Sequence, residues 1–271
     1  MDKRFLEILV NKEELVTDFP KWMLSESTVS DIRKTEHIAI AEIAGRDSIA
    51  AVIRACELRT IKAVIPTIAY TGTEYGNWEV PFEKTGILKY KLRDKSIKVY
   101  DPIILGSPKL WRNLCGRYMT HFLNKFGFFS PCVGCHLYFH ALRIPLAINL
   151  HCRLIIGGER ESHNGKIKIN QTAISLDAYI DLLKKFDIEL FLPIRKVISG
   201  REIEMIVGEN WDEGDQQLEC VLSKNYQELN GEVIFNEDAI KRYFDEFALK
   251  VAEESIEKYL TIRDSFVRNI I

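Results

Sequence analysis

The pair Cys132 and Cys135 offers the clearest chemistry in this sequence of 271 residues. The Cys-x-x-Cys spacing stands just ahead of an expected helix, so the two thiols lie close enough to share a metal and the helix N-terminus favours thiolate. Gly134 permits the tight backbone that such a knuckle needs. Two thiolates do not complete a site, and we expect Cys220, in a polar, loop-like segment far downstream, to supply a third.

The residue types leave the bound group open. A zinc ion with His136 or His140 as a fourth ligand would be structural. A redox dithiol is disfavoured because the cysteine pair does not follow the first strand of a thioredoxin-like unit, and two unconnected buried cysteines are the remaining alternative. Cys115 is a poorer ligand than Cys220 because its segment is typical of a helix that faces a core.

The segment 43–48, Ile-Ala-Gly-Arg-Asp-Ser, joins an apolar strand to a helix. A glycine-containing turn at this place points backbone N–H groups and the positive end of the helix dipole at an anion. Arg46 adds a positive charge, and we expect Asp47 or Ser48 to cap the helix. With one glycine and no Gly-Lys-Ser/Thr, the loop is neither a Walker loop nor a G-x-G-x-x-G fingerprint, and a plain capped turn is the alternative.

A third polar segment begins at Gly157 and Gly158, directly after an apolar strand. Glycines at a strand end lie at the edge of an α/β sheet where ligands bind. Arginine suits bidentate phosphate recognition and lysine serves as a point charge, although a solvated loop with two salt bridges is the alternative. The candidates for phosphate or substrate contact are Arg160, His163, Asn164 and Lys166. Arg143, on the helix after the cysteine pair, is expected at the surface or facing the substrate.

Apolar runs alternate with helical patterns from about residue 39 to residue 207, as in a parallel sheet with crossover helices. The expected strands are 37–44, 61–70, 96–105, 152–158 and 188–194. The expected helices are 47–58, 107–126, 135–150 and 175–186. Pro145 is expected to kink the third helix or limit its start. The sequence therefore predicts an α/β fold with a Rossmann-like, doubly wound parallel sheet and helical additions at both ends.

The order of strand, Gly-x-Asp-Ser and apolar helix resembles the S-G-G-x-D-S signature of the PP-loop ATP pyrophosphatases, the adenine nucleotide α-hydrolase-like superfamily. Ile43 and Ala44 replace the superfamily's Ser and first Gly, so one hydroxyl donor to phosphate is lost. The resemblance implies that the loop binds the phosphates of ATP, with Mg²⁺, and that the enzyme adenylates an oxygen of its acceptor. The implied contacts are Ala44, Gly45, Arg46, Asp47 and Ser48, with Asp47 catalytic and Arg46 a replacement for the lost Ser.

Three later features resemble the same superfamily. Thr71, just past the second strand, stands where the superfamily contacts adenine and ribose. The segment with Gly157, Gly158 and Arg160 resembles a loop of the sulfonucleotide reductases that binds an adenine nucleotide. A cysteine pair followed by one distant cysteine resembles the tRNA 2-thiolation branch, in which three cysteines hold a 4Fe–4S cluster with one iron open for sulfur. The implied ligands are Cys132, Cys135 and Cys220, with Cys220 also catalytic.

The resemblance covers about residues 37–222 and implies an ATP-dependent enzyme. AMP would pass to a carbonyl oxygen of the acceptor with release of pyrophosphate, and sulfur from a donor would then displace AMP. The predicted segments are a helical preface over 1–36, the ATP-binding domain over 37–232 and a helical appendix over 233–271. Two alternatives stay open: an amide- or nitrile-forming enzyme of the 7-cyano-7-deazaguanine synthase kind with structural zinc, and a non-catalytic module that binds adenine nucleotides.

The composition limits the partners. Apolar residues at 46%, charged residues at 28% and a net charge of −2 describe an ordinary globular protein without a global basic field for nucleic acid. No apolar run approaches the length of a membrane span and the start is not a secretion signal, so we expect a cytoplasmic protein. The expected acceptor is a small molecule or a carrier, with RNA on a local patch as the alternative. Residues 236–266 are a candidate homodimer contact because they are amphipathic.

Overall fold

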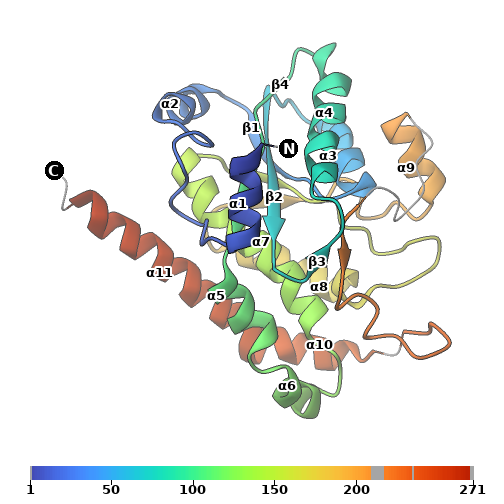
Figure 1. The fold of residues 1–271 in the computed structure, drawn as a ribbon. Coiled ribbons are helices and arrows are strands. Elements are labelled where there is room, and N and C mark those ends of the chain that lie inside the picture. The colour runs from blue at the N-terminus through green and yellow to red at the C-terminus, as the bar shows by residue number, and fades with distance from the viewer. Residues whose placement is uncertain (1, 209–216, 234, 269–271) are drawn as a thin grey trace.

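The computed structural model describes residues 2–208, 217–233 and 235–268. Its centre is a six-stranded parallel sheet in the order β4-β2-β1-β6-β7, with β5 also paired to β2 (Figure 1). The strands are β1 (Ile38–Glu42), β2 (Ala63–Tyr70), β4 (Lys98–Val99), β5 (Ile103–Gly106), β6 (Leu154–Ile156) and β7 (Glu189–Phe191). The chain proceeds outward from β1 in one direction and then in the other, which confirms the predicted doubly wound α/β fold.

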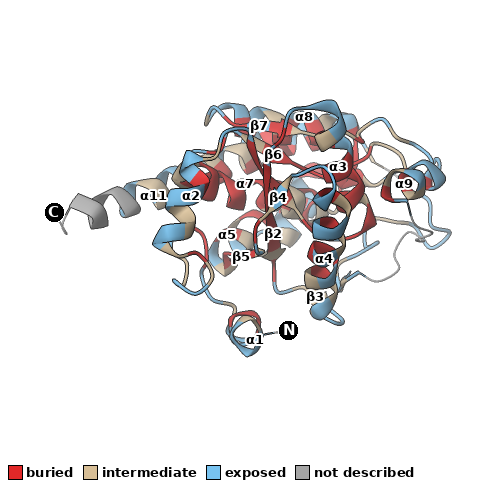
Figure 2. Cartoon of the chain, turned by 90° about the horizontal axis from the view of Figure 1, so that it is seen from above, coloured by how far each residue is buried: buried red, intermediate tan, exposed pale blue. Residues whose placement is uncertain are grey.

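Helices cover both faces of the sheet because alternate strand residues point to opposite sides. Ile38 and Ile40 of β1 belong to one apolar core, while Ala39 and Ala41 belong to the other. The helices on the first side are α2 (Glu26–Lys34), α7 (Pro131–Leu150), α8 (Ala173–Lys184), α10 (Glu237–Tyr243) and α11 (Leu249–Arg268). Those on the second side are α3 (Arg46–Leu58), α4 (Glu79–Arg93) and α9 (Gly200–Val207). Figure 2 shows the buried residues gathered along the strands, α3 and α7.

Shorter elements connect these layers. Two of them, β3 (Glu74–Tyr75) and β8 (Glu219–Cys220), form a separate antiparallel pair. The others are α1 (Lys3–Asn11), α5 (Pro108–Trp111), a π-helical turn (Arg112–Gly116), α6 (Met119–Phe126), a 3-10 turn (Ile169–Gln171) and a second π-helical turn (Phe244–Ala248).

The predicted elements are present, with three differences. The expected strand 96–105 is two short strands, because Asp101-Pro102 interrupts the ladder between β4 and β5. The expected helix 107–126 is broken into α5, a π-helical turn and α6. Helix α7 starts earlier than predicted, at Pro131, and continues through Pro145 to its end, so that proline does not limit its start.

The helical segments at both ends of the sequence pack on the sheet domain. Ile32 of α2 and Ile256 of α11 belong to the same apolar core as the α7 side of the sheet. Tyr259 of α11 donates a hydrogen bond of 2.6 Å to Glu14. The segment boundaries 36/37 and 232/233 stay predictions, and residues 1, 209–216, 234 and 269–271 of those segments lie outside the described residues. Across the described part of the chain, every helix is too short or too polar to cross a membrane.

Candidate functional site

The loop between β1 and α3 is shaped by one hydroxyl group. Ser48 Oγ donates to the carbonyl oxygen of Gly45 at 2.7 Å and accepts from the backbone N–H of Ala44 at 3.0 Å. Gly45 is the N-cap of α3, and as a glycine it has no side chain with which to cap the helix. The prediction that Asp47 or Ser48 caps α3 is therefore wrong, because the Ser48 hydroxyl closes the loop and Asp47 pairs with arginine. The first turn of α3 keeps N–H groups that an anion can bind.

Asp47 is held between two arginines. Its carboxylate accepts from Arg160 Nε at 2.8 Å and from Arg46 Nε at 3.3 Å. Arg46 is also 3.5 Å from Glu204 of α9. The Arg160 side chain is fully buried, and its remaining nitrogens contact His163 Nδ1 at 3.0 Å and the carbonyl oxygen of Ile198 at 3.2 Å. Arg160 therefore ties the loop after β6 to the phosphate-loop candidate, and its predicted contact with phosphate stays a prediction.

Close packing against backbone requires a glycine at position 158, whereas a Cβ at Gly157 would meet only the ends of side chains. A Cβ atom on Gly158 would stand 2.7 Å from the Cα atom of Ser48 and 2.8 Å from its backbone nitrogen. A Cβ atom on Gly157 would meet Glu159 Oε2 at 2.5 Å and Leu192 at 2.9 Å. The absence of side chains at these positions lets the segment after β6 lie directly on the first turn of α3. The two segments meet at the carboxyl edge of the sheet, where the glycines after β6 were expected.

A cavity of about 200 Å³ opens where these segments meet. Of the predicted nucleotide contacts, the following line it: Ala44, Gly45, Arg46, Asp47, Ser48 and Gly158. His163, Gln171 and Gln217 complete part of the wall. Gly157, Arg160 and Thr71 do not line this cavity. The N-terminus of α3 and Arg46 at this cavity suit the phosphates of a nucleotide, while the carboxylates of Glu42, Asp47 and Glu159 also line it.

One carboxylate and two histidines meet at this cavity, where Glu159 and His136 line the wall and His140 does not. His140 Nε2 of α7 contacts Glu159 Oε1 at 2.8 Å, and His136 Nδ1 is 3.7 Å from the same oxygen. Burial raises the pKa of Glu159, but the charges and hydrogen bonds of His140 and His136 outweigh burial and hold that pKa well below its usual range. Asn170 fixes His136 through a contact of 2.7 Å with Nε2. This arrangement keeps Glu159 ionised inside the protein.

Arg143 is not at the surface, so the expected surface position is wrong. The side chain is fully buried within α7 and the sheet. Its Nε donates to Thr67 Oγ1 at 2.8 Å, its Nη1 donates to the carbonyl oxygen of Phe139, and its Nη2 is 3.8 Å from Glu42. Arg143 therefore balances part of the charge of Glu42 and ties α7 to β2.

The cysteine pair lies in the first turn of α7, and the β3–β8 pair brings Cys220 to it. Thr73 Oγ1 lies 3.2 Å from Cys220 Sγ, and the Cys132 thiol is 3.6 Å from the carbonyl oxygen of Leu222, two residues after Cys220. Burial, together with the neighbouring Cys135 and Cys220, raises the pKa of Cys132 to about 12. The three predicted ligands are thus neighbours although they are far apart in sequence.

Cys115 joins this group from the π-helical turn after α5, which the sequence reasoning missed. Its predicted position in a core is confirmed, since the side chain is 2% exposed. Burial raises its pKa well above the usual value, and a hydrogen bond with the Cys135 thiol raises it further. Trp111 Nε1 donates to Cys135 Sγ at 3.4 Å. A helical pattern in the sequence places Cys115 toward a core but does not tell which core residues it meets.

The spacing of the three thiols tests whether they could bind a single zinc ion. Within the part of the chain that the structure describes, the one group of three metal-ligating atoms within 4.8 Å of one another is Glu42, His140 and Glu159. The thiols of Cys132, Cys135 and Cys220 therefore do not all lie within that distance. A single zinc ion with Zn–S bonds of about 2.3 Å needs its thiolates about 3.8 Å apart. The ligands of a cluster bind different irons, so they stand farther apart.

Comparison with known proteins identifies a family. No family model matches the sequence. The chain is 38% identical over 261 residues to the uncharacterized protein MJ0009 of Methanocaldococcus jannaschii, and the match covers 94% of each chain. The chain belongs to the family of MJ0009. Because that relative is uncharacterized, membership does not bring an activity with it.

The chain is also similar to a solved structure, that of the U34-tRNA thiolase NcsA from Methanococcus maripaludis with its 4Fe–4S cluster. The TM-score is 0.40 and the sequence identity is 12%, over 96% of this chain and 80% of that chain. Likeness at this level assigns neither a ligand nor an activity to a chain of the MJ0009 family.

Two further predicted positions lie outside the cavity beside α3. Thr71 hydrogen-bonds to Thr73 Oγ1 and Glu74 Oε1, each at 2.7 Å, so it belongs to the turn that carries β3 toward Cys220. Its contact with adenine or ribose stays a prediction. Asn164 accepts from the backbone N–H of Gly200 at 2.9 Å and thereby fixes the start of α9.

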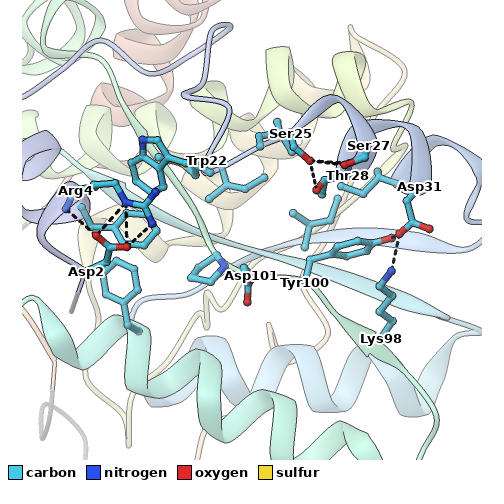
Figure 3. A pocket seen from close by; sticks show the side chains of 18 residues that line it. Asp2, Arg4, Trp22, Ser25, Ser27, Thr28, Asp31, Lys98, Tyr100 and Asp101 are labelled. Carbon is cyan, nitrogen blue, oxygen red and sulfur yellow. Dashed lines mark hydrogen bonds and ion pairs between the residues drawn. The ribbon is translucent and has the colours of Figure 1, made fainter.

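A larger cavity of about 620 Å³ lies elsewhere, between the N-terminal helices and β4–β5 (Figure 3). Its polar side chains pair with one another. Asp31 accepts from Lys98 and Tyr100, each at 2.6 Å, and Arg4 lies 4.4 Å from the ring of Trp22. None of the predicted site residues lines this space. The chemistry of the MJ0009 family is therefore better sought at the carboxyl edge of the sheet.

Proposed function

We propose that this protein is a PP-loop ATP-dependent enzyme that transfers AMP to an oxygen of its acceptor and then transfers sulfur. The observation that carries the proposal is the position of two consecutive residues in α7. Cys135 belongs to the cysteine group, and His136 lines the cavity beside Gly45–Ser48. An acceptor activated at the cavity would therefore lie close to the cysteines.

Different residues around the cavity would have different roles in binding ATP. The uncapped first turn of α3 would bind the phosphates of ATP, with Mg²⁺ bridging phosphate oxygens. Asp47, fixed by Arg46 and Arg160, would keep the loop in its binding conformation. Their contribution is positioning and charge neutralisation rather than covalent chemistry. The proposal does not specify the sulfur donor, nor whether the acceptor is a small molecule, a carrier or RNA. The cytoplasmic location stays a prediction.

A 4Fe–4S cluster is supported by the convergence of Cys132, Cys135 and Cys220, with Cys115 beside Cys135, at a spacing wider than one zinc ion needs for three thiolates. Cys132, Cys135 and Cys220 would hold the cluster. When bound, the cluster would supply an iron that has no protein ligand and can bind sulfur.

Metal analysis of anaerobically purified protein tests the cluster. We expect about four irons and about four acid-labile sulfides per chain, with most of both lost in Cys220→Ser. Cys56→Ser is the matched control, because Cys56 is half-buried on the far side of the sheet, and it should keep the wild-type content. A colourless protein that contains zinc would instead support the amide- or nitrile-forming alternative.

Pyrophosphate release from ATP tests the first step. We expect Asp47→Ala to abolish release, whereas Asp177→Asn, which alters an exposed carboxylate paired with Arg195, should leave it unchanged. If the wild type releases no pyrophosphate with any acceptor tried, the adenylation step is wrong.

One observation favours a second candidate, a module that binds adenine nucleotides without turnover. Ile43, which replaces the signature serine, is buried in the apolar core on the α3 side. Arg46, the candidate replacement, pairs with Asp47 and Glu204 instead of extending into open space. Nucleotide binding without pyrophosphate release would favour this candidate.

A further inference from the structure

A cluster of carboxylates and imidazole lies inside the carboxyl edge of the sheet, apart from the cysteines. Glu42 is the last residue of β1, Glu159 follows β6, and His140 lies in the middle of α7. One ligand atom from each lies within 4.8 Å of the other two. His140 is fully buried and Glu159 is 3% exposed.

The charges of this cluster are incompletely balanced. Within the described residues, Oε2 of Glu42 and Oε2 of Glu159 are buried and have no hydrogen-bond partner. Buried carboxylate oxygens without partners carry a large desolvation cost. Arg143 Nη2 lies 3.8 Å from Glu42 Oε1, which is beyond hydrogen-bonding distance. The geometry leaves room for a positive charge between the carboxylates.

The distances suit an ion. Octahedral bonds of about 2.1 Å place adjacent ligand atoms about 3.0 Å apart. His140 Nε2 and Glu159 Oε1 are joined by a hydrogen bond of 2.8 Å, and a cation bound by both atoms would take the place of the shared proton at nearly this spacing. His136 Nδ1, 3.7 Å from the same oxygen and without a hydrogen-bond partner among the described residues, stands beside them as a further donor. Two carboxylates with imidazole suit a hard to borderline dication better than a thiol-seeking one.

We propose that Glu42, His140 and Glu159 form a site for a divalent cation of the Mn²⁺ or Fe²⁺ class, which the protein binds in the absence of nucleotide. Glu42, Glu159 and His136 line the same cavity as Gly45–Ser48. The cation would therefore face an anion bound at the loop. That last role depends on the proposed nucleotide function, whereas binding of the cation does not.

Mn²⁺ is the probe, because thiolates prefer softer metals and Mn²⁺ binding can be followed by electron paramagnetic resonance. We expect nucleotide-free wild-type protein to bind one Mn²⁺ per chain. Glu42→Gln and Glu159→Gln should weaken binding roughly 10- to 100-fold or more. Glu161→Gln is the matched control, since Glu161 lies two residues from Glu159 but pairs with Arg195 and Lys196, and it should bind like the wild type.

The proposal is overturned if the wild type binds no Mn²⁺, or if a folded Glu42→Gln protein binds it as tightly as the wild type. Glu42 lies at the end of its strand with its side chain 12% exposed, so this variant remains informative if Glu159→Gln fails to fold. Failure of the nucleotide function is distinguishable. Suppose that the protein releases no pyrophosphate but binds Mn²⁺ in a way that depends on Glu42. The cation site would then be supported and the proposed enzymatic function would be contradicted.

Discussion

Gly158 is the residue on which the meeting of the two cavity loops depends most directly. A methyl group there would meet the Ser48 backbone, at 2.7 Å from Cα, which can move only if α3 or the segment after β6 moves. We expect Gly158→Ala to destabilise the protein by about 1–3 kcal/mol and to weaken nucleotide binding. Thermal unfolding and nucleotide titration measure the two effects.

The matched control is Gly86→Ala. Gly86 lies within α4 with no atom within 4 Å of the added carbon, so alanine there should stabilise the helix by about 0.5–1 kcal/mol. Equal stability of Gly158→Ala and wild type would show that the two loops are not packed as described.

Glu161 gives a pH-dependent prediction. Burial raises its pKa, but hydrogen bonds from Lys196 and Arg195 outweigh burial and hold that pKa below the usual 4.5. A carboxylate with a lowered pKa in the folded state stabilises the protein above pH 4.5, and this contribution disappears as the pH falls through the lowered pKa. Glu161→Gln should lose about 0.5–1 kcal/mol at neutral pH, and the difference from wild type should shrink in acid. Urea unfolding of both proteins at neutral and at acidic pH measures the difference in unfolding free energy. A difference that does not change with pH would contradict the lowered pKa of Glu161.

The residues of the site were predictable only where local chemistry reveals them. Gly45, Asp47 and the cysteine pair stand in recognisable spacings next to predicted elements. Glu42 and Cys115 carry no such signal, because the first ends an apolar strand and the second lies in a helical pattern. The best available signal for Glu159 was its place directly after two glycines at a strand end.

The turn after β2 is the element that positions Cys220. Glu74 accepts from the backbone N–H groups of Thr71 and Gly72, at 2.7 and 2.9 Å, and then pairs with Cys220 across β3 and β8. Glu74→Ala should destabilise this turn by about 1–2 kcal/mol and reduce the iron retained after brief exposure to air. Glu83→Ala, at an exposed position of α4, should retain iron like the wild type. Unchanged iron retention in Glu74→Ala would show that β3 does not position Cys220.

The helices and strands were predictable where the apolar periodicity is strong and no proline or glycine interrupts it. Helix α4 was missed because Pro81 and Gly86 interrupt its pattern and its buried stripe includes Lys84 and Thr85. Pro81 is tolerated because it lies in the first turn, where its missing N–H has no helical partner. The β3–β8 pair could not be predicted, since it joins two-residue strands that are distant in sequence.

At the scale of the whole molecule, α11 closes the core rather than standing apart. Ile256 is fully buried in the core on the α7 side, and Tyr259 hydrogen-bonds to Glu14 near the other end of the chain. Ile256→Ala should therefore cost about 2–5 kcal/mol of unfolding free energy. Thr261→Ala, at an exposed position of the same helix, should cost far less. Chemical denaturation compares them, and similar values would mean that α11 contributes little to the fold. The predicted homodimer stays a prediction.

Helix α7 supplies groups to both chemical regions within about 16 Å of its length: Cys132 and Cys135 first, then His136 and His140, then Arg143. A rigid rod moves as a unit. Any shift of α7 that adjusts the thiols therefore also changes the distances around Glu159 and Glu42. The proposed binding of a cluster at one end of α7 and of a cation at the other should therefore be coupled, and thermodynamics requires such coupling to be reciprocal.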